Sequence, residues 1–126
     1  MGKGIESIKL RATISPMQDT VARFTYPTCQ RFAEHAGSAF QLSIAQADTV
    51  ILELTAVKPF PKSLDITDKS LKISSFSLYF SSTATPHLQQ GSYALRHPVL
   101  GTMEMFIVPI GPSAKGTQYE AIFNLD

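Results

Sequence analysis

Three histidines, one cysteine and a few glutamates on predicted strands are the side chains of this sequence that could do chemistry. His97 stands out, because Pro98 holds it in extended backbone and Glu104 can approach it from the following strand. An imidazole beside a carboxylate can bind a ligand or move a proton. The simpler interpretation is a turn histidine whose ring is hydrogen-bonded to the backbone. His97 and Glu104 are therefore the candidate binding residues, with both interpretations open.

The remaining reactive side chains do not predict a metal site or a nucleophile. His35 and His87 do not form a ligand pair with His97 on one element, and zinc needs three or four converging ligands. Cys29 falls on the apolar face of a predicted helix, so we expect a buried, unreactive thiol. No serine stands in a G-x-S-x-G motif. We expect no catalytic residue, no metal and no cofactor, and an enzyme remains the weakest alternative.

One turn-rich stretch, Gly111–Thr117, superficially resembles a phosphate-binding loop. Such a loop places its lysine after the second glycine and opens a helix. Here Lys115 precedes Gly116, and an alternating strand pattern follows. We therefore expect a hairpin loop at residues 111–116.

Strands must position most of these side chains, because the apolar residues alternate with period two after Ser38. A short helix comes first, with Thr28 as its N-cap and Gly37 as its C-cap. Its apolar face consists of Cys29, Phe32, Ala33 and Ala36. About six strands follow, at residues 38–45, 50–57, 71–81, 91–96, 102–110 and 118–124, with a turn at residues 46–48, a bulge near residues 74–75 and a tight turn at residues 97–101 closed by Gly101.

The connections between the later strands are too short to hold crossover helices, so these strands should be antiparallel. The predicted fold is mainly β: a small antiparallel barrel or a two-layer sandwich of about six strands with one short helix. The 126 residues fit a single domain, 1–126. Within it, residues 1–27 are a possible loosely attached N-terminal extension.

Composition narrows the choice of partners. Eleven basic and ten acidic residues give a net charge of +1, too little to attract nucleic acid or an anionic membrane. No apolar run reaches the ~20 residues that span a bilayer, and the start lacks a signal-peptide pattern. A single cysteine excludes an internal disulfide. We expect a soluble, cytoplasmic protein without nucleic-acid or membrane binding.

The last part of the chain resembles a bacterial family known only as a domain of unknown function. The resemblance is carried by Phe76–Phe80, Gly91–Gly101, Phe106–Pro112 and Tyr119–Asn124. The family pattern there is roughly Q-G-x-Y-x-L-x-H-P-x-L-G, F-x-V-P-x-G-P and Y-E-A-x-F-N. The resemblance implies no catalytic residue. It implies an association with tail-collar or fibre-like proteins, and so an accessory role.

The favoured function is a non-enzymatic structural or protein-interaction module, an accessory of a phage-tail-like or appendage assembly. It would bind a protein partner or form a homo-oligomer through exposed sheet surface. The alternative is a β-barrel that holds a small apolar ligand, because the sequence is dense in aromatic residues and methionines.

Overall fold

A computed structural model describes residues 26–44 and 49–125, and strands make up about 55% of the structure. The predicted turn at residues 46–48 and all but the last two residues of the predicted extension 1–27 lie outside the described residues. In chain order the described elements are α1 (Cys29–Ala33), β1 (Ala39–Ser43), β2 (Thr49–Pro59), β3 (Ser75–Ser82), β4 (Gly91–His97), β5 (Gly101–Ser113) and β6 (Gly116–Asn124).

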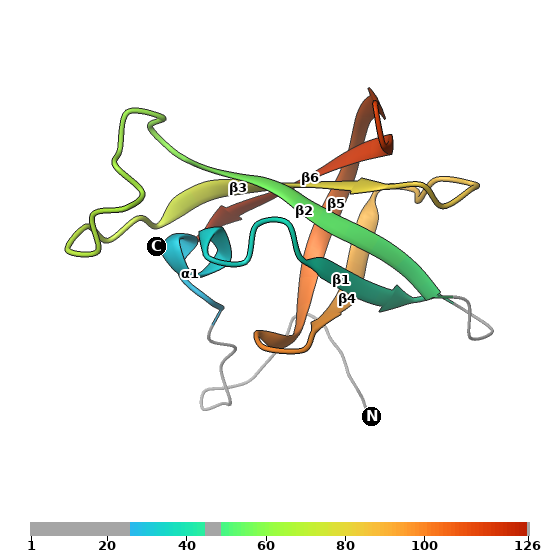
Figure 1. The fold of residues 1–126 in the computed structure, drawn as a ribbon, viewed down its shortest axis with the longest axis horizontal. Coiled ribbons are helices and arrows are strands. Elements are labelled where there is room, and N and C mark those ends of the chain that lie inside the picture. The colour runs from blue at the N-terminus through green and yellow to red at the C-terminus, as the bar shows by residue number, and fades with distance from the viewer. Residues whose placement is uncertain (1–25, 45–48, 126) are drawn as a thin grey trace.

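The six strands form a closed antiparallel barrel in the order β1-β2-β3-β6-β5-β4 (Figure 1). The prediction of a mainly β fold with one short helix is confirmed, and the barrel alternative is the correct one. Closure depends on β1, which pairs with β2 along its whole length and with β4 through Gln41 and Leu42. A sandwich would leave this seam between β1 and β4 open.

Alternation of apolar and polar residues places one side of every strand in a common core. The helix closes one end of the barrel, where β3 begins and β6 ends (Figure 1). Its Phe32 ring lies 5.9 Å from the ring of Phe76 and 5.6 Å from that of Phe123, measured between centroids. The Phe76 and Phe123 rings stack at 5.0 Å. These aromatic contacts fix α1 over the barrel end.

The helix is shorter than the sequence predicted. Thr28 is the N-cap as expected, and its hydroxyl accepts a hydrogen bond of 3.0 Å from the amide of Arg31. However, α1 ends at Ala33, and the predicted C-cap Gly37 lies beyond it. The Gly37 amide donates instead to the carbonyl of Leu54 at 2.7 Å. Pairing with β2 therefore draws the chain out of the helix one turn early.

The segment before β3 was predicted to be strand from residue 71, but β3 starts at Ser75. The Leu71 amide closes a turn onto the Asp68 carbonyl, and the Leu71 carbonyl accepts from the Gln30 side chain. Residues 71–74 are therefore held against α1 by Gln30 and are not part of a strand. The bulge expected near residues 74–75 is also misplaced, since the register of β2 against β3 shifts between Leu54 and Ala56.

The predicted loop at residues 111–116 is wrong in its first half. Strand β5 continues to Ser113, which pairs with Gly116 at the start of β6. The β5–β6 pairing shifts register between Pro109 and Gly111, where the proline has no amide N–H to donate. This shift lets β5 continue past the proline to Ser113. The tight turn predicted at residues 97–101 is confirmed: His97 pairs with Gly101, whose φ is +88°.

Candidate functional site

His97 ends β4 with its side chain buried inside the barrel, where only 6% of it is exposed. Its Nδ1 accepts hydrogen bonds from the amides of Val99 at 3.0 Å and Leu100 at 3.1 Å. Its Nε2 lies 2.9 Å from Oγ of Ser38. Because Nδ1 accepts twice, the proton resides on Nε2 and is donated to Ser38. The prediction of a turn histidine bonded to backbone is confirmed.

A second imidazole packs against this ring. The centroids of His35 and His97 lie 4.9 Å apart with the rings nearly perpendicular, and Phe40 covers His97 at 4.7 Å. Within the described residues, the buried Nε2 of His35 has no hydrogen-bond partner. Burial lowers the pKa of His97 below its usual value, and the charges of His35 and Arg31 lower it further. The cluster therefore holds a neutral imidazole with a structural role.

Glu104 does not approach His97. It pairs with Ala94 in the β4–β5 ladder and is exposed on the outer face of the barrel, whereas His97 points inward. Its backbone carbonyl accepts a hydrogen bond of 2.7 Å from the hydroxyl of Tyr26. The two candidate binding residues lie on opposite faces of the barrel wall, so they cannot share a proton or a ligand.

The remaining reactive groups do not converge on a common site in the described part of the chain. Cys29 is fully buried, and burial raises the pKa of its thiol to about 11, so it stays protonated at neutral pH. Glu120 accepts from the hydroxyls of Ser77 at 2.9 Å and Tyr79 at 3.0 Å. Across residues 26–44 and 49–125, no three His, Cys, Asp or Glu side chains are grouped to hold a metal ion. His87 lies exposed in the loop before β4.

The barrel interior is packed with side chains. The inward residues of all six strands belong to one buried cluster, with Phe40, Phe80 and Tyr119 among its largest members. Three hollows of about 530, 290 and 250 Å³ all lie on the outer surface.

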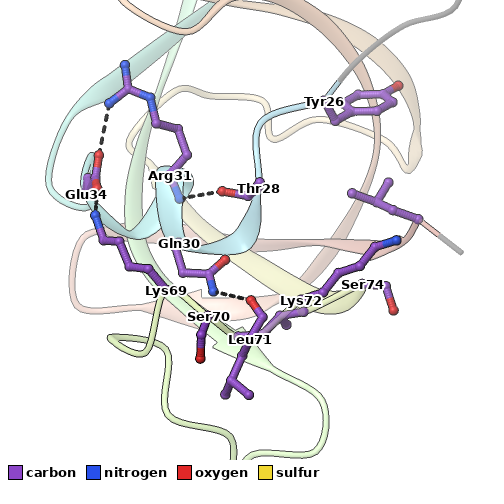
Figure 2. A pocket seen from close by; sticks show the side chains of 12 residues that line it. Tyr26, Thr28, Gln30, Arg31, Glu34, Lys69, Ser70, Leu71, Lys72 and Ser74 are labelled. Carbon is purple, nitrogen blue, oxygen red and sulfur yellow. Dashed lines mark hydrogen bonds and ion pairs between the residues drawn. The ribbon is translucent and has the colours of Figure 1, made fainter.

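The 530 Å³ hollow lies between α1, the segment that leads into β3, and Leu125 after β6. Figure 2 shows the Arg31–Glu34–Lys69 trio at one end and Lys72 with Tyr26 at the other. Between these ends, the side-chain amide of Gln30 donates to the Leu71 carbonyl at 3.0 Å. We call this hollow the helix groove.

The helix groove is not predicted by the sequence. The apolar pattern places Leu71 and Ile73 on the strand predicted at residues 71–81. The sequence feature that could have indicated the groove is the pair Leu71 and Ile73, which alternates with lysines directly after a polar loop. It identifies a segment that packs on one side only, but it does not say which element covers that side.

The fold and its site define a small closed antiparallel barrel, capped by one helix, with a filled interior and a groove outside. The chain matches the family model described as Domain of unknown function (DUF6916) over residues 27–123, and it belongs to that family. The match begins one residue before the predicted helix cap. No curated protein and no solved structure matches the chain significantly. In the described part of the chain, no helix is long and apolar enough to cross a membrane.

Proposed function

We propose that the protein is a non-enzymatic interaction module, an accessory that binds a protein partner or its own copies within a phage-tail-like or appendage assembly. The observation that carries this proposal is an apolar patch on the outer barrel face. Phe106 of β5 is 52% exposed and Ile122 of β6 is 66% exposed. We call these two residues the outer patch.

The two patch residues lie on neighbouring strands. Val108 pairs with Glu120, and Phe106 and Ile122 each lie two residues beyond that pair, in the same direction and on the same face. Large apolar side chains that stay exposed on one face of a barrel wall are typical of protein-binding surfaces. Aromatic residues are enriched at such surfaces, which adds weight to Phe106.

The alternatives have less support. A small apolar ligand inside the barrel would have to displace buried side chains such as Phe40 and Leu78, at several kcal/mol each by comparison with core truncations of about 3–5 kcal/mol. An enzyme based on His97 and Glu104 would need the two to meet across the barrel wall. The cytoplasmic location remains part of the proposal, and a single buried, unpaired cysteine is compatible with it.

Native mass spectrometry of the tagged chain, isolated from the cell that makes it, tests the proposal. We expect a complex of defined stoichiometry that the double variant Phe106→Ser/Ile122→Thr loses. The matched control is Ile51→Thr, because Ile51 is also an exposed strand isoleucine but lies on β2. A strict monomer at micromolar concentration in every sample would contradict the proposal.

A further inference from the structure

The helix groove has walls held in place by hydrogen bonds. The side-chain amide of Gln30 contacts two carbonyls of the facing segment, Leu71 at 3.0 Å and Asp68 at 3.4 Å. Ile73 is buried in the floor, and the Leu125 amide donates to the Ser74 carbonyl at 2.7 Å. The hollow is therefore preformed, which reduces the entropy lost when an extended segment binds in it.

The charges around the groove do not balance. Arg31 and Lys69 both contact the carboxylate of Glu34, at 3.0 and 2.7 Å. Lys72 lies at the other end of the groove (Figure 2) and forms no ion pair within the described residues. Among the described residues that line the groove, three cations thus face one carboxylate. The groove favours an anionic occupant, and Lys72 is the cation that is free to pair with it.

The floor of the groove is apolar, with side chains of Leu71, Ile73 and Leu125. An occupant must therefore combine acidic groups with apolar side chains. A small amphiphile such as a fatty acid would need most of its surface enclosed. Here most of the rim is exposed, including Arg31, Lys69 and Lys72. An open groove with charged ends suits a short extended peptide better.

We propose that the helix groove binds a short linear segment of a protein partner in which Asp or Glu residues flank Leu, Ile or Phe. This inference rests on the proposed interaction function and deepens it, because it names the chemistry of one partner segment. Apolar side chains of the segment cover Leu71 and Leu125, and one of its carboxylates pairs with Lys72.

Selection from a displayed library of random decapeptides on the full chain tests the inference. We expect the enriched peptides to combine Asp or Glu with Leu, Ile or Phe. Titration of one enriched peptide should shift the amide resonances of Gln30, Leu71 and Ile73. Selection of no peptide, or of peptides without acidic residues, would overturn the inference.

Charge reversal then locates the contact. Lys72→Glu should weaken binding of the enriched peptide by about tenfold or more, which corresponds to about 1.4 kcal/mol of binding free energy. Lys62→Glu is the matched control, since Lys62 is an exposed lysine outside the groove, and it should leave the affinity within about twofold. Equal weakening by the two variants would show a nonspecific charge effect and overturn the assignment.

Two further measurements test whether the groove binds a small amphiphile or a second copy of the chain instead. Dodecanoate that shifts the groove resonances, when no peptide is selected, would reassign the groove to a small amphiphile. A concentration-dependent dimer abolished by Lys72→Glu would reassign it to a second copy of the chain.

If the outer-patch complex forms while no peptide is selected, the groove assignment fails and the proposed function stands. If a peptide binds while no complex forms, the outer patch fails instead.

Discussion

At the scale of single residues, His97 changes from a candidate ligand to a structural hydrogen-bonding centre. Its two ring nitrogens join the β4–β5 turn to Ser38, which precedes β1. Protonation of Nδ1 would remove the acceptor that the amides of Val99 and Leu100 share. The ring therefore stabilises the fold only in its neutral form.

This arrangement predicts a pH dependence of stability. The folded-state pKa of His97 is lowered by burial and then by His35 and Arg31. The unfolded chain therefore binds the proton more readily, and stability falls as the pH drops below the unfolded value of about 6.5. Urea unfolding between pH 7.5 and 5.5 should show this loss.

His97→Asn keeps an acceptor near the position of Nδ1 but cannot titrate, so its loss of stability over the same pH range should be smaller. His87→Asn is the control, because His87 lies exposed in a loop. If His97→Asn and the wild-type chain lose stability equally between pH 7.5 and 5.5, another group is responsible.

Two glycines with positive φ allow the steric and conformational costs to be separated. Gly101 has φ +88° and open space around the position of a Cβ atom. Gly116 has φ +110°, and a Cβ there would lie 2.1 Å from the Ser82 carbonyl oxygen. Gly101→Ala should cost about 1–2 kcal/mol, the conformational cost alone.

Gly116→Ala should cost clearly more, because the backbone of Ser82 must also move. Chemical denaturation of the two variants and the wild-type chain measures the difference. Equal costs for the two substitutions would mean that β6 does not start in close contact with the end of β3.

At the scale of elements, the sequence predicts most strands correctly because their apolar period is long and regular. The segments it misassigns are short and are decided by tertiary contacts. The Leu54 carbonyl draws Gly37 out of the helix, and Gln30 draws Leu71 away from the sheet. Neither contact is encoded within a local window of residues.

The same reason explains the candidate site. Pro98 and Gly101 correctly predict the turn that holds His97, because turn chemistry is local. Whether Glu104 approaches His97 depends on which face of the barrel wall each side chain occupies. That in turn depends on the register of the β4–β5 ladder, which has no local signal. Neither the His35–His97 contact nor the helix groove has a local pattern, because each joins segments far apart in the sequence.

The link between α1 and the segment before β3 predicts a local change in dynamics. Gln30→Met removes the hydrogen bonds to Leu71 and Asp68 while it keeps the length of the side chain. Amide hydrogen exchange over residues 69–73 should become about two- to tenfold faster, because the two lost hydrogen bonds, one short and one long, together stabilise the segment by about 0.5–1.4 kcal/mol.

Gln90→Met, in the exposed loop before β4, is the matched control and should leave that exchange unchanged. Unchanged exchange in Gln30→Met would show that the groove walls are held by apolar packing alone.

At the scale of the whole molecule, the inward side chains of the closed barrel form one buried core, and both surfaces that we propose for binding lie outside it. The interior contains stacked aromatic rings and buried methionines, which explains the composition that suggested a ligand-binding barrel. The outer patch and the helix groove involve different elements. The barrel could therefore contact two segments of an assembly at once, which would strengthen binding through an effective local concentration.

The central claim is that the protein acts as an interaction module through the outer patch. Photocrosslinking from a benzoylphenylalanine placed at Phe106, in the cell that makes the protein, tests it most directly. We expect one discrete adduct, either with a partner or with a second copy, that the same group at Ile51 does not give. The absence of an adduct at Phe106, or identical adducts from both positions, would contradict the claim.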